Sequence, residues 1–304
     1  MTTFDSAPSA NLIRPPISWG ARAGALVALT KPRLTVMSVL TGMTTYFTAG
    51  GLTNGLFLAT LLGTSLSACG ALSLNQWWER RTDALMQRTW QRPLPQALLT
   101  PAEALSWSLS LSFIGVGLLA TCVNGASALL AVATILIYGV VYTPLKRRTR
   151  WATEVGSISG ALPALLGSAA AGDIGSRPGL ALFGILLCWQ MPHFFAIGWR
   201  HRFDYQLAGF PLRPAGDPTG SRTAAWAFGY TTVLLGVSIA PWALGWLGAF
   251  YGMMAIVGGG WFLLIAWRFA RTENRDAAAK RFFLASIAYL PAIMIALIID
   301  RLMS

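Results

Sequence analysis

Long apolar runs dominate this chain of 304 residues and alternate with short polar connections. Each run approaches the ~20 residues that a helix needs to cross ~30 Å of hydrocarbon. Nine such runs lie at 34–50, 56–74, 103–121, 126–144, 153–171, 179–199, 223–241, 247–267 and 282–300. The pattern predicts an all-α, polytopic membrane protein with nine transmembrane helices. We expect an N-terminal segment at 1–33 and a nine-span domain at 34–304.

The positive charges are distributed unevenly between the two ends of the predicted helices. All Lys and Arg residues except Arg177 and Arg301 lie in the N-terminal segment or in every second connection. Because short cytoplasmic connections retain Lys and Arg, the distribution predicts a cytoplasmic N-terminus and, after nine spans, an external C-terminus. We expect an integral protein of a bacterial inner membrane.

The composition agrees with a membrane protein, since 55% of the residues are hydrophobic, 11% are charged and the mean hydropathy is +0.56. The net charge of +12 comes from residues that flank the predicted spans, where they attract anionic lipid head groups. No nucleic-acid-binding module accompanies these charges. We therefore expect membrane lipid around the chain and no nucleic acid as a partner.

A polar motif lies where the second apolar run meets a basic connection. It consists of Asn75, Glu79 and Asp83, which are spaced four residues apart. On a helix this spacing directs all three side chains to one face. Amide and carboxylate oxygens suit Mg²⁺, which commonly completes its shell with water and substrate phosphates. Arg88 and Arg92 follow and could bind the same phosphates through charge-assisted hydrogen bonds.

A second connection with acidic and basic residues follows the sixth run and contains Asp204 among arginines. The two longest basic connections follow runs two and six, which indicates a weak internal repeat of four helices. In both, a helix is expected to leave the membrane carrying an acid among arginines. The arrangement favours a polar site with two centres between helix ends.

Four stretches of this sequence carry a resemblance to a known family. They are 29–33 (LTKPR), 75–95, 142–149 (YTPLKRRT) and 192–211, which begins with Pro-His-Phe and includes Asp204-Tyr205. In order and spacing these stretches resemble the UbiA-type intramembrane prenyltransferases, and within them the branch that farnesylates protohaem. The N-x-x-x-D-x-x-x-D element marks the superfamily, and the other features favour the haem branch.

The resemblance implies a nine-span bundle around a cavity that opens to the cytoplasmic side and to lipid. Farnesyl diphosphate would place its diphosphate at the acidic loops, with Mg²⁺ as the cofactor. A vinyl group of haem B would attack the allylic cation, and water would complete the new substituent. Aromatic faces can stabilise such a cation, so Trp77, Trp78 and Tyr142 are candidates. A haem A synthase or a terminal oxidase would be the partner that receives the product.

The resemblance also implies roles for individual residues. Asn75, Glu79, Asp83 and Asp204 would hold the metal and, with Lys146, form the catalytic set. The substrate-binding set, for the diphosphate or the haem propionates, would be Arg88, Arg92, Arg147, Arg148, Tyr142 and His193, with Lys146 also neutralising the substrate. His193 would face the haem.

Two positions depart from the family pattern. Glu79 stands where the family has Asp, which lengthens the side chain by one methylene. Phe203 precedes Asp204 where an acid is usual, so one acidic ligand is missing. We therefore expect the first motif to carry most of the metal binding.

Structural explanations compete with these roles. Acids among arginines often form surface ion pairs, and the basic run 146–150 would mark topology in any membrane protein. His193 could be a packing residue, and Trp77 and Trp78 could anchor the chain at the membrane interface. Two other function classes also stay open. One is a UbiA-type transferase with another aromatic or tetrapyrrole acceptor, and the other is a transporter.

Overall fold

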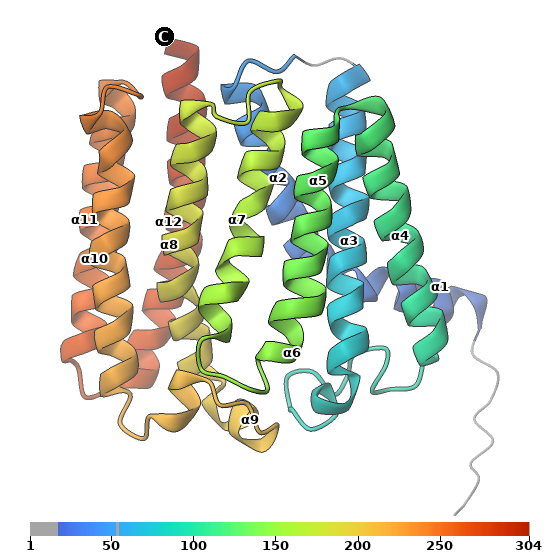
Figure 1. The fold of residues 1–304 in the computed structure, drawn as a ribbon. Coiled ribbons are helices and arrows are strands. Elements are labelled where there is room, and N and C mark those ends of the chain that lie inside the picture. The colour runs from blue at the N-terminus through green and yellow to red at the C-terminus, as the bar shows by residue number, and fades with distance from the viewer. Residues whose placement is uncertain (1–17, 53–54, 304) are drawn as a thin grey trace, which may run out of the picture.

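The described residues, 18–52 and 55–303 of a computed structural model, form a bundle of helices and contain no strand. Most helices stand side by side, and the C-terminus lies at the end opposite α9 (Figure 1). The upright helices are α2 (Pro32–Thr48), α3 (Gly55–Asp83), α4 (Pro101–Cys122), α5 (Gly125–Ile135), α7 (Ala152–Ala170), α8 (Arg177–Arg200), α10 (Ser221–Ala243), α11 (Ala249–Arg271) and α12 (Arg275–Met303). A π-helical turn, Leu136–Tyr142, and the short α6, Thr143–Leu145, continue α5.

The predicted all-α membrane fold is confirmed, but the count of nine spans is not. A helix covers each predicted run, yet only seven described helical segments are long and apolar enough to cross a membrane. The number rises to eight if α1 and α2, which meet at a bend of 44°, form one span. The remaining run corresponds to α7, whose 19 residues include several Ser and Gly and are mostly buried.

One helix was not predicted. Within the N-terminal segment, α1 spans Trp19–Leu29, and the Ser18 side chain caps it by accepting a hydrogen bond from the Ala21 amide. It crosses behind α3 and α4 instead of running along the bundle (Figure 1). The rest of that segment, 1–17, lies outside the described residues, and the division at residue 33 stays a prediction.

Close packing of small residues joins the helices that carry the site. A Cβ added to Gly167 of α7 would lie 1.8 Å from the Gly42 carbonyl oxygen of α2. A Cβ added to Gly115 of α4 would lie 2.4 Å from the Ser67 amide of α3. Such contacts let helix backbones approach each other without large apolar side chains between them, as in other membrane bundles. Together with the packing of α2 on α3, they make α2, α3, α4 and α7 one packed unit.

A second unit is built on aromatic packing. Buried side chains of α8, α10, α11 and α12 share one apolar core. In this core Phe262 stacks on Phe282 at 5.1 Å and on Tyr289 at 5.3 Å between ring centres. The helices α7 and α8 join the two units.

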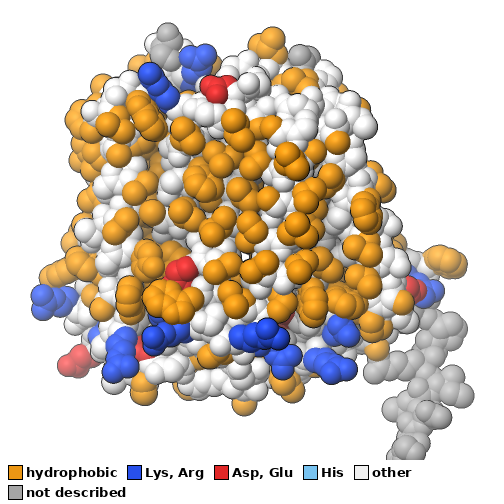
Figure 2. Space-filling model, viewed as in Figure 1, with side chains coloured by type: hydrophobic (Ala, Val, Ile, Leu, Met, Phe, Trp, Pro, Cys, Tyr) orange, Lys and Arg blue, Asp and Glu red, His pale blue; other side chains and the backbone are white. Residues whose placement is uncertain are grey.

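The surface shows the charge distribution that the sequence indicated. Hydrophobic side chains cover the side of the bundle, while Lys and Arg side chains form a row along the end that carries α9 and the longest loops (Figures 1 and 2). At this end α3 continues beyond its apolar run to Asp83. The polar motif is therefore helical, as predicted, and lies just inside the basic row.

Candidate active site

The three motif residues lie on the last turns of α3 and point to one side, as their spacing predicted. Asn75 is 1% exposed, Glu79 8% and Asp83 0%. Burying carboxylates is costly unless cations or hydrogen bonds compensate for the lost water. Their burial weighs against the alternative that they form ordinary surface ion pairs. Buried carboxylates of this kind need partners that neutralise them.

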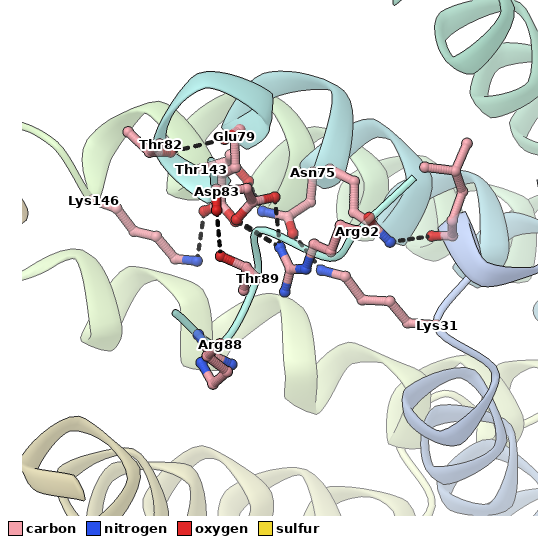
Figure 3. Close-up of polar contacts among 12 residues, drawn as sticks. Lys31, Asn75, Glu79, Thr82, Asp83, Arg88, Thr89, Arg92, Thr143 and Lys146 are labelled. Atoms are coloured by element: carbon pink, nitrogen blue, oxygen red, sulfur yellow. Dashed lines mark hydrogen bonds and ion pairs between the residues drawn. The ribbon is translucent and has the colours of Figure 1, made fainter. Parts of the chain in front are cut away.

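Three cations reach these side chains from three other segments (Figure 3). The Lys31 ammonium donates to Asn75 Oδ1 at 2.6 Å, and the Lys146 ammonium donates to Glu79 Oε1 at 2.8 Å. Arg92 Nη1 donates to both oxygens of Asp83, at 2.8 and 2.7 Å, and lies 3.9 Å from Glu79 Oε2. These six residues, Lys31, Asn75, Glu79, Asp83, Arg92 and Lys146, are called the polar cluster below.

The backbone of each segment explains how these cations arrive. Lys31 has a left-handed backbone (φ 48°) and joins α1 to α2 before Pro32. Gln76 fastens this junction to α3 by donating to the carbonyl oxygens of Ala28 and Leu29, at 3.2 and 3.0 Å. The junction therefore holds Lys31 over the face of α3 that carries Asn75.

The π-helical turn and α6 position the opposite side of the polar cluster. Thr143 Oγ1 accepts a hydrogen bond from Asn75 Nδ2 at 3.0 Å and donates to the Tyr138 carbonyl oxygen at 2.7 Å. The Lys146 ammonium lies 4.5 Å from the centre of the Tyr142 ring. Tyr142 therefore lies at the polar cluster, where its ring can face a cation.

The polar cluster places three basic side chains opposite two carboxylates. Burial and the neighbouring Arg92 lower the pKa of Lys31 to about 7, so the cluster becomes positive as Lys31 takes up its proton. Burial opposes protonation of Lys146, but the Glu79 carboxylate outweighs it and raises the Lys146 pKa well above its usual range. Lys146 is therefore a cation throughout the neutral range. A positive, partly enclosed cluster of this kind attracts a multivalent anion.

Asp204 lies elsewhere. It belongs to α9 (Arg202–Leu207), and its carboxylate accepts hydrogen bonds from the backbone amides of Gln87 and Arg88 at 3.2 and 3.4 Å. The Arg88 side chain donates to the Tyr205 hydroxyl at 3.5 Å and lies apart from the α3 carboxylates (Figure 3). The second acidic segment thus fastens the loop that follows α3 and is not brought to the polar cluster.

Several other predicted site residues are also outside the polar cluster. Arg147 and Arg148 are exposed in the turn after α6. Trp77 packs against the apolar side chains between α1 and α4, and Trp78 is 44% exposed. Of the three aromatic candidates, only Tyr142 lies beside a cation of the polar cluster.

His193 forms a separate centre on α8. Its ring stacks between Trp189 and Phe283, with centres 4.7 and 5.2 Å away, and its Nδ1 lies 2.7 Å from Ser286 Oγ. Trp189 lies one turn away on α8, whereas Phe283 and Ser286 come from α12. His193 is thus part of a polar contact between α8 and α12.

Sequence reasoning missed Lys31, Gln76 and Thr143 as site residues. Lys31 and Thr143 fall inside stretches that carried the family resemblance, 29–33 and 142–149, which was the available signal. Nothing in the sequence indicated a left-handed junction at Lys31.

The donor atoms of the polar cluster fit a magnesium ion that is held partly by its substrate. They comprise two carboxylates and one amide oxygen on one helix face, all hard oxygen donors. Across 18–52 and 55–303, no group of three or more His, Cys, Asp or Glu side chains could hold a metal. Two carboxylates are too few for a closed protein cage, but they suit Mg²⁺ that completes its shell with water and phosphate.

Comparison with known proteins shows which family the chain belongs to. The profile of the UbiA prenyltransferase family matches residues 35–287. A protoheme IX farnesyltransferase of Opitutus terrae is 42% identical over 275 residues, which cover 90% of this chain and 93% of the relative.

Solved structures share the fold. A digeranylgeranylglyceryl phosphate synthase superposes with a TM-score of 0.78 at 15% identity, covering 93% of this chain and 99% of that one. A UbiA homolog from Archaeoglobus fulgidus bound to GPP and Mg²⁺ gives a TM-score of 0.61 at 16% identity, covering 90% and 99%. At this level of sequence identity, the solved structures support the fold and not the function.

Proposed function

Because this chain belongs to the UbiA prenyltransferase family, we propose that it transfers the farnesyl group of farnesyl diphosphate to a vinyl group of haem B. The products are haem O and diphosphate, and one water is consumed. The observation that carries this function is the near full-length likeness to relatives named protoheme IX farnesyltransferase. The buried polar cluster supplies the chemistry that such a transfer needs.

The polar cluster binds the diphosphate end of the donor. Lys31, Arg92 and Lys146 provide donors for phosphate oxygens, and Arg92 can contact two oxygens at once. As the bond between farnesyl C1 and oxygen breaks, negative charge builds on the leaving diphosphate. Fixed cations in a partly buried site stabilise that charge without reorganisation.

Asn75, Glu79 and Asp83 would hold Mg²⁺ in the proposed site. When bound with diphosphate, this ion neutralises part of the charge on the leaving group. The A. fulgidus homolog bound to GPP and Mg²⁺ supports a metal in the family, although not its ligands in this chain.

Arg92 and Lys146 now contact the carboxylates that would ligate the metal. The proposal therefore includes an exchange of partners. The carboxylates pass to the metal, and the two cations pass to the oxygens of the diphosphate that arrives with it. Tyr142, whose ring already faces the Lys146 ammonium, lies where it can stabilise the allylic cation.

Asp204 acts through the first cytoplasmic loop in this proposal. Its hydrogen bonds to the Gln87 and Arg88 amides fix the loop that also carries Arg92. Met86 of the same loop packs against Ala208 and Phe210 beyond α9. In the form described here Asp204 is a positioning residue and a metal role for it is not needed.

The chain is an integral membrane protein. We place it in a bacterial inner membrane with the basic row, and hence the polar cluster, on the cytoplasmic side. A haem A synthase or a terminal oxidase would receive haem O, which is too apolar to leave the membrane freely.

Membranes containing the chain test this function. They are incubated with haem B, Mg²⁺ and farnesyl diphosphate, and extracted haems are analysed by mass spectrometry. A mass gain of one farnesyl group plus one hydroxyl group is expected, since the other proton of the water is released with the diphosphate. Unchanged haem with a prenylated hydroxybenzoate would instead assign another acceptor, and uptake of solute into vesicles without either product would indicate a transporter.

A further inference from the structure

His193 of α8 contacts Ser286 of α12, where the two helices pack together. We infer that His193 Nε2 is the axial ligand to the iron of haem B, and that Ser286 positions it by accepting a hydrogen bond from Nδ1–H. The inference rests on the proposed function, because haem B is the acceptor there. It adds a specific bond that orients the acceptor.

The hydrogen bonds of Ser286 determine which ring nitrogen carries the proton. Ser286 Oγ lies 2.6 Å from the Phe283 carbonyl oxygen, which can only accept, so the hydroxyl proton is used there. The same Oγ lies 2.7 Å from His193 Nδ1 and must accept from it. A neutral imidazole held in this way has its proton on Nδ1 and a lone pair on Nε2.

The surroundings favour the neutral ring. Trp189 and Phe283 cover its two faces in stacked contacts, at interplanar angles of 21° and 29°. A charged imidazolium between apolar rings would lose its hydration without gaining an anionic partner, because no carboxylate contacts His193 in the described chain.

Nε2 is the atom that remains available. The two ring faces and Nδ1 are occupied, and no described residue forms a hydrogen bond with Nε2. His193 as a whole is partly buried. An imidazole whose Nδ1–H is donated to an oxygen and whose Nε2 is open has the arrangement of a metal-bound histidine.

Iron coordination is the chemistry that this arrangement suits best. Nε2 would donate its lone pair to the iron and displace a weak axial ligand such as water, with no change in the oxidation state. Arg200, whose guanidinium lies 5.1 Å from the Phe283 ring centre, adds a positive charge nearer the cytoplasmic end. It lies ~10 Å from His193 along the helix axis, where it can attract a haem propionate.

The chain offers a matched control, since it has two histidines, His193 and His201. His201 is the residue after α8 and lies near the positive charges of Arg88 and Arg200. The full chain is purified in lipid nanodiscs and titrated with haem B in the absence of farnesyl diphosphate. Absorption and resonance Raman spectra report the axial ligand.

Wild type and His201→Ala are expected to give the spectrum of imidazole-ligated haem. His193→Gly should lose it, and added imidazole should restore it by occupying the vacated space. Ser286→Ala should keep the ligand but lower haem affinity by about 10-fold to 100-fold and shift the iron–histidine stretch, because the ring loses its hydrogen-bond partner. Thermal unfolding midpoints show whether each variant is folded.

The failures can be told apart. If wild type makes haem O while His193→Gly keeps the wild-type haem spectrum, the ligand assignment is wrong and the proposed function stands. Loss of the spectrum in His201→Ala instead of His193→Gly also overturns the assignment. A wild-type chain that neither binds haem nor makes haem O overturns both proposals.

Discussion

Replacing Lys146 with alanine tests whether this cation stabilises both the buried Glu79 carboxylate and the departing diphosphate. The side chains of Lys146 and Glu79 are 18% and 9% exposed and are joined at 2.8 Å. In the variant, Glu79 keeps only the more distant Arg92 Nη1, 3.9 Å from Oε2. Breaking a buried ion pair costs ~3–5 kcal/mol, and the nearby Arg92 places this case at about 3 kcal/mol.

The effect on turnover follows from the cation that the departing diphosphate loses. Removing one fixed donor from a buried site for developing negative charge lowers kcat by ~10²–10³-fold. Lys146→Arg keeps the charge but changes its shape, so its loss should be smaller, within about tenfold. Arg150→Ala removes an exposed charge from the same loop and is the matched control for nearby surface charge.

The pH dependence has a definite sign. The folded pKa of Lys146 is raised above its unfolded value of ~10.4, so its contribution to stability is complete below that value. It is lost only as the pH rises through the folded pKa. Lys146 itself therefore adds no pH dependence to stability below about pH 9. The stability difference between wild type and Lys146→Ala should vary near neutral pH only through Lys31, whose pKa of about 7 is lowered mainly by burial and in part by Lys146.

Initial rates of haem O formation at varied farnesyl diphosphate give kcat and KM, and thermal unfolding of the nanodisc-embedded protein reports stability. Lys146→Ala should lower kcat far more than it raises KM. A variant with wild-type kcat, or a loss equal to that of Arg150→Ala, would refute the role of Lys146 in stabilising the leaving group.

Three further predictions concern binding and packing. Mn²⁺, as a probe for Mg²⁺, should bind weakly alone and at least tenfold more tightly with inorganic diphosphate, because Arg92 and Lys146 then gain new anionic partners. Equal Mn²⁺ affinities with and without diphosphate, in a titration followed by electron paramagnetic resonance, would exclude the proposed exchange of partners. Gly167→Ala should lower the thermal midpoint by several degrees through collision with Gly42, whereas Gly184→Ala, whose Cβ meets Val237 at an ordinary 3.4 Å, should not. Glu154→Gln should destabilise the chain by about 2–4 kcal/mol, since Arg213 would stay buried between two indole rings without its anion; an unchanged denaturation midpoint would contradict this.

The sequence was informative where the physical cause is local. The helical face shared by Asn75, Glu79 and Asp83 follows from a spacing of four residues, and the structure shows all three buried on that face. The apolar runs likewise mark the helices because lipid imposes both length and composition. The run at 153–171 also marks a helix, α7, but its Ser and Gly residues pack inside the bundle and α7 is not among the described helices apolar enough to cross a membrane.

What could not be predicted depends on contacts between distant segments. The pairing of Lys31 with Asn75 requires a left-handed junction between helices, and Ser286 reaches His193 only because α12 packs against α8. Asp204 resembles a metal ligand by its motif, yet its nearest donors are the backbone amides of another loop. Sequence patterns identify the chemical groups, and tertiary packing decides which of them meet.

Diphosphate release measured together with haem O in a single turnover tests the central claim most directly. Purified wild type should release one diphosphate for each haem O formed. Asp83→Asn, which removes one charge from the polar cluster at nearly constant shape, should produce neither while its haem spectrum stays that of wild type. Normal release and normal haem O from Asp83→Asn would contradict the assignment of the polar cluster as the site where the diphosphate departs.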